Sequence, residues 1–224
     1  MSRREAKTAL YEQFARIGKG LANPKRLELL DLLSQGERSV EALASVAGLG
    51  LSTASMHLQA LKEAGLVASR REGTFIHYRL AGQDVGALFS MLREVATAHL
   101  AEVDRAAIRY LGENPHDLAE AVERSDLLQR VRAGEVVVLD VRPTLEYEAG
   151  HIPGAISVPL EQLENFLSRP MKEKDIVVYC RGAYCVLAYD AVRKLKMKGR
   201  RALRLQEGML EWHLAGLPVE SGAA

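Results

Sequence analysis

The chain contains two cysteines, Cys180 and Cys185, which lie close together. Cys180 directly follows the apolar run 176–179, and a helical pattern begins within a few residues of it. A cysteine between a strand and a helix lies where loop amides and the helix N-terminus converge, and both favour a thiolate. We therefore predict that Cys180 is reactive and can hold an added sulfur atom as a persulfide; a buried, inert cysteine is the alternative.

The second cysteine allows two interpretations. Across a curled loop, the sulfurs of Cys180 and Cys185 could meet in a disulfide or be bridged through added sulfur atoms, if the geometry permits it. Alternatively, Cys185 is a small residue that packs under the loop. Because the chain has only two cysteines, it cannot build a framework of several disulfides or a four-cysteine zinc site.

The elements that must position these cysteines are typical of an α/β domain. Residues 136–139 and 176–179 are continuous apolar runs, as expected for strands buried on both faces of a parallel sheet. Helical patterns lie between and after them, as in 182–197. Open α/β sheets place their sites at the carboxyl ends of the strands, which is the expected position of Cys180.

The preceding part of the chain is helical apart from one hairpin. Apolar spacing and capping residues predict its elements. These are a helix around Leu10, Phe14, Ile17 and Leu21, a helix from Pro24 to Gly36, a helix capped by Ser39 that ends near Ala47, a helix from Ser52 to Ala64, a hairpin over 66–80 with its turn at 71–74, and a long helix from Asp84 to about Leu111.

The helix that begins near Ser52 has an apolar face, on which we expect Leu51, Ala54, Leu58 and Leu61 to be buried. Its other face has no charge before Lys62. Short hydroxyl and amide groups suit contacts with base edges and phosphates, although an ordinary surface helix is the alternative. The candidate DNA contacts on this helix are Ser52, Thr53, Ser55, Met56, His57 and Gln59.

The hairpin after this helix favours DNA binding. It carries Arg70, Arg71, His77 and Arg79, which are candidates for phosphate or minor-groove contacts. A helix-turn-helix followed by such a hairpin is a winged-helix arrangement, whose recognition helix enters the major groove. Residues 1–80 contain 12 Lys and Arg against 8 Asp and Glu, a mild bias in the direction that DNA requires.

Two segments, NPKRLELL at 23–30 and STASMHLQALKEAGLV at 52–67, closely resemble the ArsR/SmtB family of bacterial repressors over roughly the first hundred residues. The resemblance implies a homodimer, formed through the first helix and the 84–111 helix, that binds a near-palindromic operator in double-stranded DNA. Many members of that family sense metals, but here 37–41 has no thiol and Gly86 stands where a histidine near Asp84 would be. His99 is better interpreted as a packed interface residue, so we expect no metal site and no cofactor.

Three segments in the second half resemble the rhodanese family over about 117–220. They are VLDVR at 138–142 followed by 146–156, YCRGAYCVLA at 179–188, and EGMLEW at 207–212 followed by 216–219. The resemblance implies that Cys180 accepts sulfane sulfur and carries it. The expected sulfur-binding loop consists of Arg181, Gly182, Ala183, Tyr184, Cys185 and Val186.

The resemblance also assigns roles around this loop. The Arg181 cation is expected to draw in anionic donors, whereas Asp140, Arg142 and His151 are expected to be structural. Related phosphatases and arsenate reductases close a longer loop with an arginine. Because Val186 stands at that position, we do not expect phosphate or arsenate chemistry.

Together these patterns predict a mostly α winged helix-turn-helix domain with a β-hairpin wing, followed by an α/β rhodanese-like domain with a parallel sheet. The expected limits are 1–112 for the DNA-binding and dimerisation domain, 113–116 for a linker and 117–224 for the rhodanese-like domain. No apolar run is long enough to cross a bilayer and no leader opens the chain, so we expect a soluble cytoplasmic protein and no membrane partner.

The combination favours a hypothesis of transcriptional regulation, most simply as a repressor. Polysulfide, a persulfide or thiosulfate reacts at Cys180, with or without Cys185, and changes the affinity for the operator. The alternative is a sulfurtransferase enzyme with an attached DNA-binding domain, which would turn over thiosulfate or a persulfide. A third interpretation is that the rhodanese fold serves only as a ligand-binding or partner-binding module.

Overall fold

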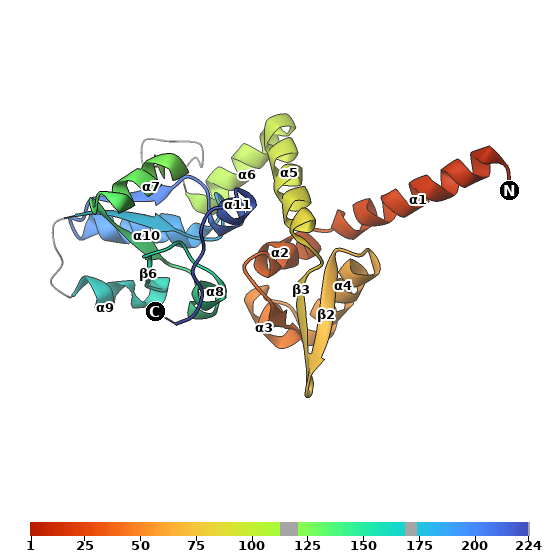
Figure 1. The fold of residues 1–224 in the computed structure, drawn as a ribbon, viewed down its shortest axis with the longest axis horizontal. Helices are drawn as coiled ribbons and strands as arrows, with labels where there is room; N and C mark the ends of the chain where they lie inside the picture. The colour runs from red at the N-terminus through yellow and green to blue at the C-terminus, as the bar shows by residue number, and fades with distance from the viewer. Residues whose placement is uncertain (113–120, 169–173, 224) are drawn as a thin grey trace. The chain divides into compact units, whose positions relative to one another are not determined.

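The computed structural model describes residues 1–112, 121–168 and 174–223 (Figure 1). The chain divides into two compact units, 1–89 and 90–224. The domain limits that we expect from the sequence stay a prediction, and the expected linker at 113–116 lies outside the described residues. Among the described residues, no helix has both the length and the apolar character needed to cross a membrane.

The first unit is a winged helix-turn-helix, as predicted. Its three-stranded sheet has the order β1-β3-β2, and every neighbouring pair is antiparallel. Its elements are α1 (Arg3–Leu21), α2 (Pro24–Leu33), β1 (Arg38–Ser39), α3 (Val40–Val46), α4 (Leu51–Glu63), β2 (Val67–Glu72), β3 (Phe75–Leu80) and the beginning of α5 (Gln83–His99).

Short polar side chains determine where two helices of this unit begin. The Asn23 carboxamide accepts hydrogen bonds from the amides of Lys25 and Arg26 at 3.0 and 3.2 Å, and Pro24 is the first residue of α2. The Ser39 hydroxyl accepts a hydrogen bond from the amide of Ala42 at 3.2 Å, so α3 begins after Ser39 as predicted.

Helix α4 packs through the predicted face, with one exception. Ala54, Leu58 and Leu61 are completely buried, but Leu51 is 53% exposed. The prediction for Leu51 is wrong because this residue is the first of the helix and lies at the end of the face that packs on α2 and α3. The wing is the hairpin of β2 and β3, whose register pairs Glu72 with Phe75 across a two-residue turn.

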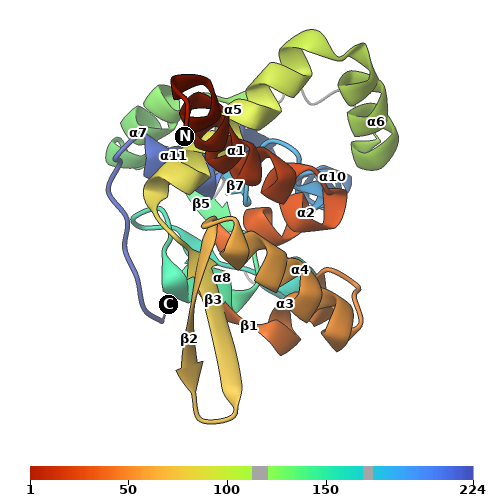
Figure 2. The same cartoon turned by 90° about the vertical axis from the view of Figure 1, so that its right-hand side faces the viewer.

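The long helix predicted from Asp84 to about Leu111 is two helices, α5 and α6 (Ala101–Leu111), separated at Leu100. Figure 2 shows them pointing in different directions. The break brings Ala107 and Leu111 of α6 into an apolar cluster with Tyr189, which lies on α10 (Val186–Met197). The prediction is wrong here because this cluster depends on residues far apart in the chain, which a local helical pattern does not show.

The second unit is an α/β domain with a five-stranded parallel sheet of order β4-β8-β7-β5-β6, which confirms the predicted fold class. Besides the end of α5, α6 and α10, its elements are β4 (Ala121–Val122), α7 (Arg124–Arg132), β5 (Val136–Asp140), α8 (Thr144–Ala149), β6 (Ile156–Ser157), the 3-10 helix η2 (Leu160–Gln162), α9 (Leu163–Leu167), β7 (Asp175–Tyr179), β8 (Ala202–Leu205) and α11 (Met209–Leu214).

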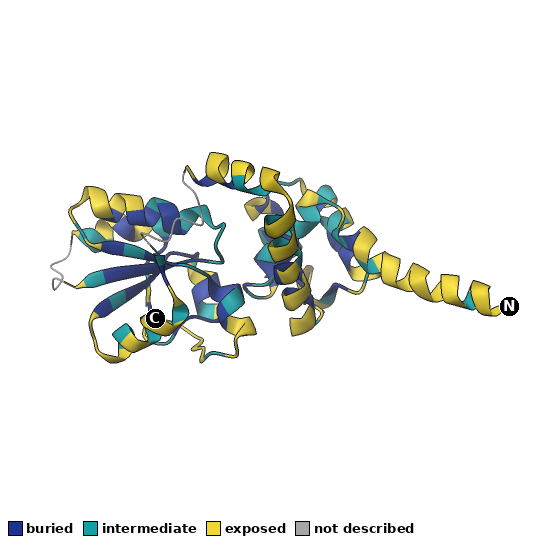
Figure 3. Ribbon diagram, turned by 90° about the horizontal axis from the view of Figure 1, so that it is seen from above, coloured by how far each residue is buried: buried dark blue, intermediate teal, exposed yellow. Residues whose placement is uncertain are grey.

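Both faces of this sheet are buried, and its central strands are dark blue in Figure 3. Alternate residues of β7 separate into two apolar clusters. Val177 and Tyr179 pack with α7, α8 and α11, whereas Ile176 and Val178 pack with α9 and α10. Burial on both sides explains why β5 and β7 are apolar except for Asp140 and Asp175 at one end of each strand. It leaves their carboxyl ends as the edge from which functional loops emerge.

Candidate functional site

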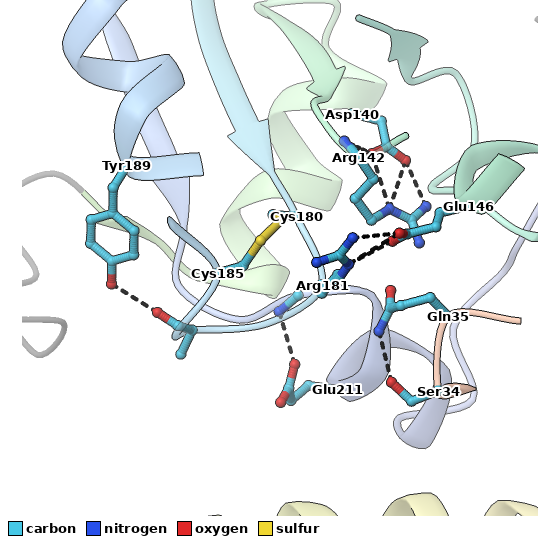
Figure 4. Close-up of a disulfide and its surroundings, with 12 residues drawn as sticks. Ser34, Gln35, Asp140, Arg142, Glu146, Cys180, Arg181, Cys185, Tyr189 and Glu211 are labelled. Atoms are coloured by element: carbon cyan, nitrogen blue, oxygen red, sulfur yellow. Dashed lines mark hydrogen bonds and ion pairs between the residues drawn. A yellow bond between two sulfur atoms is a disulfide. The ribbon is translucent and has the colours of Figure 1, made fainter. Parts of the chain in front are cut away.

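Cys180 lies directly after β7 and is 2% exposed, whereas Cys185 is partly exposed and is the N-cap residue of α10. The two residues form a disulfide with an S–S distance of 1.98 Å and a Cα–Cα distance of 6.1 Å (Figure 4). Of the alternatives left open by the sequence, the structure shows a direct bridge. The loop between them therefore joins a strand end to a helix N-terminus and holds both thiol positions together.

Hydrogen bonds within the polypeptide fold this loop. The amide of Cys185 donates to the carbonyl of Gly182 at 3.0 Å, which closes the turn. The hydroxyl of Tyr189 on α10 donates to the carbonyl of Ala183 at 2.8 Å (Figure 4). The curled shape that brings the two cysteines together is thus held by bonds other than the disulfide.

A second segment, 206–211, supports the loop from the side. The amide of Met209 donates to the carbonyl of Cys180 at 3.1 Å, and that of Leu210 donates to the carbonyl of Arg181 at 3.3 Å. A Cβ atom at Gly208 would lie 2.2 Å from the amide nitrogen of Gly182, so only glycine fits there. This close approach gives a physical reason for the glycine in the 207–212 segment.

The Arg181 side chain does not face outward as a free cation. Its guanidinium group donates three hydrogen bonds, at 2.6 to 3.1 Å, to the carboxylate of Glu146 on α8, which is completely buried (Figure 4). The expectation that Arg181 draws in anionic donors is therefore not supported, because its charge neutralises a buried carboxylate. Glu146, the partner that anchors the loop, is not among the site residues predicted from the sequence.

Asp140 and Arg142 form a completely buried ion pair with an N–O distance of 2.6 Å. Asp140 also accepts a hydrogen bond from the hydroxyl of Tyr179 at 2.6 Å, and Arg142 donates to the carbonyl of Gly150 at 2.7 Å. Burial, reinforced by the Asp140 charge, holds the pKa of Tyr179 well above its ordinary value, so its hydroxyl stays a donor. This network holds the ends of β5 and β7 together beneath the loop.

His151 is also buried in contacts within the domain. Its ring stacks on that of Tyr147, with 3.6 Å between centroids, and its Nδ1 lies 2.9 Å from the Tyr147 carbonyl oxygen. Like Asp140 and Arg142, His151 thus lies where a structural role is expected.

Within the second unit, the C-terminal half of α5 contacts the loop. The hydroxyl groups of Thr97 and Tyr184 are 2.8 Å apart, and the Arg93 guanidinium lies 5.3 Å from the centre of the Tyr184 ring. Arg93 also forms an ion pair with Glu211 at 3.3 Å. Arg93 and Thr97 are not among the residues predicted from the sequence, because nothing in a helical pattern indicates which distant loop a polar face will contact.

A pocket of about 430 Å³ lies between α5, the loop and the 206–211 segment. Burial raises the pKa of Glu207, one of its acidic residues, above the ordinary value despite the nearby charge of Arg124. The pocket borders Ala183 and Tyr184 of the loop. It is lined by Ser90, Arg93, Glu94, Thr97, Ala98, Ala183, Tyr184, Gln206, Glu207 and Glu211.

In the first unit, the candidate DNA-contacting side chains on α4 differ in their exposure to solvent and in their hydrogen bonds. Ser52 and Met56 are exposed, and Thr53, Ser55 and His57 are partly exposed. Gln59 is exposed too, but its amide donates to the hydroxyl of Tyr78 at 3.1 Å, which ties α4 to the wing.

The basic residues of the wing also differ. Arg71 and Arg79 are exposed, whereas Arg70 forms ion pairs with Glu37 and Glu72, both at 2.5 Å. His77 is partly buried, with its Nε2 3.8 Å from Glu72. Arg71 and Arg79 are therefore better placed to meet phosphates than Arg70, whose charge is already compensated by two carboxylates.

In the parts of the chain that the structure describes, no three His, Cys, Asp or Glu side chains lie together in an arrangement that could hold a metal ion. His99 is exposed at the end of α5, and Glu102 pairs with Arg105 at 2.5 Å.

Comparison with known proteins identifies relatives of both units. Residues 21–70 match the family described as a helix-turn-helix domain, and residues 123–215 match the rhodanese-like domain. Over 219 residues the chain is 56% identical to the HTH-type transcriptional regulator Rv0324 of Mycobacterium tuberculosis, a match that covers 98% of this chain and 95% of that protein.

Two further relatives match one part of the chain each. A sulfurtransferase of Allochromatium vinosum is 31% identical over 104 residues, which are 46% of this chain and 95% of that protein. The solved homodimeric winged helix-turn-helix DNA-binding domain Mb0332 of Mycobacterium bovis is 56% identical, with a TM-score of 0.42, and the match covers 46% of this chain and 93% of that one.

Proposed function

Because the chain belongs to the family of helix-turn-helix transcriptional regulators that carry a C-terminal rhodanese-like domain, we propose that reactive sulfur at Cys180 controls its affinity for DNA. The protein acts as a repressor, and polysulfide, a low-molecular-weight persulfide or thiosulfate supplies the sulfur. The Cys180 thiolate attacks the outer sulfur of a persulfide, so that the donor leaves as a thiolate and a persulfide forms on Cys180. Loading releases the operator.

One observation carries the proposal: the hydroxyl of Tyr184, inside the loop that bears both cysteines, is hydrogen-bonded to the hydroxyl of Thr97 on α5. Helix α5 begins at Gln83 in the first unit and continues into the second, so it connects the wing to the loop through a continuous backbone. A change in the chemistry of Cys180 that moves Tyr184 also acts on α5. A sulfur-dependent change in DNA affinity requires such a difference in contacts between two states.

The DNA contacts in this proposal come from α4 and the wing. The side chains of α4 that approach the major groove are Ser52, Thr53, Ser55, Met56, His57 and Gln59. The side chains of the wing that approach phosphates or the minor groove are Arg70, Arg71, His77 and Arg79. The protein binds as a homodimer through α1, α5 and α6. The exposed apolar side chains on these helices, which include Leu10, Phe14, Met91 and Val95, support that interface.

The experiment that tests the proposal is operator affinity at fixed salt, measured on dithiothreitol-reduced protein before and after polysulfide. We expect the affinity of the native protein to fall by about 5- to 150-fold on sulfur loading, the usual range of allosteric coupling. Cys180→Ser should show no response. An unchanged affinity in the native protein, or an equal response in Cys180→Ser, would reject sulfur sensing at Cys180.

A second candidate is a thiosulfate or persulfide sulfurtransferase. It is favoured by the likeness of the second unit to a protein named sulfurtransferase. Sustained turnover of thiosulfate with a thiol acceptor, through Cys180 and without an effect on operator affinity, would support the enzyme. A stoichiometric reaction that stops at the modified cysteine would support the sensor.

A further inference from the structure

We propose that Cys185 is a resolving nucleophile, which discharges the persulfide on Cys180 as sulfide and leaves the two residues joined as a disulfide. The inference rests on the proposed function, in which Cys180 accepts sulfane sulfur. It adds a second chemical step and a second residue. The end state of that step, a bond between Cys180 and Cys185, is the state that the structure shows (Figure 4).

The chemistry balances with the groups present. In the first step the Cys180 thiolate takes the outer sulfur of a persulfide donor, and the donor leaves as its thiolate. In the second step the Cys185 thiolate attacks Sγ of Cys180, the bond between Sγ and the outer sulfur breaks, and hydrosulfide leaves. The cysteine pair loses two electrons, and the sulfane sulfur gains them and becomes sulfide.

The loop is expected to keep Cys185 close to Cys180 also when the disulfide is reduced. Two hydrogen bonds of the loop involve no sulfur: the Cys185 amide donates to the Gly182 carbonyl, and the Tyr189 hydroxyl donates to the Ala183 carbonyl. They are therefore expected to keep the loop curled when both thiols are free. The Cα–Cα distance of 6.1 Å lies in the range from which a direct S–S bond forms. Attack within this loop therefore competes well with attack by thiols in solution.

The position of Cys185 favours its nucleophilic form. It caps the N-terminus of α10, a helix of 12 residues whose partial positive charge stabilises a thiolate. The chain has no cysteine besides Cys180 and Cys185, so within one protomer each has only the other as a partner. The existing disulfide and the helix terminus are independent observations that indicate the same role.

The difference in burial between the two cysteines determines which sulfur a reductant attacks when the disulfide is reduced. Cys180 is 2% exposed and Cys185 is partly exposed, so a dithiol reductant reaches the sulfur of Cys185 more readily. Its attack there expels the Cys180 thiolate, which restores the acceptor. The molecule then passes through three forms: dithiol, persulfide and disulfide.

The test uses full-length protein that has been reduced with dithiothreitol, freed of reductant without oxygen, and mixed with one equivalent of glutathione persulfide. Released glutathione reports loading, released sulfide reports discharge, and intact mass identifies the product. Native protein should release both and end as the disulfide. Cys185→Ser should release glutathione normally and keep the sulfur, with sulfide release slowed on the order of 100-fold.

The outcomes separate this inference from the proposed function. If Cys185→Ser releases sulfide as fast as the native protein, or if native protein keeps the sulfur as a persulfide or in a bridge with added sulfur, Cys185 is not a resolving residue. Normal loading of Cys185→Ser shows that its loop is intact. If native protein and Cys185→Ser release no more glutathione than Cys180→Ser, then sulfur loading at Cys180 itself is wrong.

Discussion

At the residue scale, the loop depends on buried charges that are each matched by a partner. Asp140 is paired with Arg142, and the buried Glu146 is paired with Arg181. A buried ion pair contributes little net stability compared with apolar side chains, but breaking one by removing a partner is costly. These four residues are better explained by the shape of the loop than by contact with a sulfur donor.

Replacing Asp140 by Asn should lower the free energy of unfolding by about 3–5 kcal/mol, because the Arg142 guanidinium would stay buried without its counter-charge. Urea unfolding followed by the fluorescence of Trp212, which is completely buried, measures the effect. Glu102→Gln is the matched control, since its ion pair with Arg105 is largely exposed and should be worth less than about 1 kcal/mol. Equal losses in the two variants would contradict this account.

At the element scale, the proposed function depends on two helices, α5 and α4. Helix α5 carries Thr97 against the loop residue Tyr184, while α4 presents its uncharged polar face beside the wing. In the proposed function, α5 takes part in the response to sulfur and α4 in DNA binding. Each can be tested by a change that leaves the other intact.

Tyr184→Phe should load sulfur on Cys180 normally but weaken the response of operator affinity to polysulfide. The lost hydrogen bond to Thr97 is worth about 0.5–1.5 kcal/mol, which corresponds to a response reduced by about 2- to 10-fold. Loading is measured by the glutathione released from glutathione persulfide, and affinity by fluorescence anisotropy. Tyr110→Phe on α6 removes the hydroxyl of an exposed tyrosine and should respond like the native protein. An undiminished response in Tyr184→Phe would show that coupling takes another route.

Arg71→Ala should weaken DNA binding by a similar factor on all sequences and reduce the slope of log affinity against log salt by about 1 per protomer. The reason is that Arg71 is exposed on the wing, where a phosphate contact releases counterions. Arg132→Ala, an exposed arginine on α7, makes the same charge change away from the wing and should leave the slope unaltered. A sequence-dependent loss in Arg71→Ala would indicate base recognition instead.

At the scale of the whole molecule, α1 presents apolar side chains that the described chain does not cover. Leu10, Tyr11 and Phe14 are each more than half exposed, and α1 is mostly yellow in Figure 3. Burial of such a stripe stabilises association in water, at roughly 25 cal/mol for each Å² of apolar surface. The proposed homodimer therefore has a surface on which to form.

Phe14→Glu should convert the dimer to a monomer, because it places a charge in the proposed apolar interface. Light scattering coupled to size-exclusion chromatography measures the mass. Operator affinity should fall on the order of 100-fold, since two half-sites are no longer bound together. Ala9→Glu adds the same charge at an exposed position about 140° around α1 from Phe14 and should stay dimeric. A monomeric native protein would refute the interface.

The elements that could be predicted from the sequence alone are those whose patterns are local. Apolar runs predicted β5 and β7, Asn23 and Ser39 predicted the starts of α2 and α3, and the residues on both sides of Cys180 predicted its place between a strand and a helix. Such features follow from the preferences of neighbouring residues, so a single sequence contains them.

The tertiary structure decided what depends on distant partners. It divided the expected 84–111 helix at Leu100, turned Arg181 toward Glu146, and placed Thr97 on Tyr184. It also shows a direct disulfide between Cys180 and Cys185, where the sequence left open whether Cys185 bonds to Cys180 or packs under the loop. Packing and charge compensation act between residues far apart in the chain, or through the curvature of a whole loop, and spacing along the sequence does not record them.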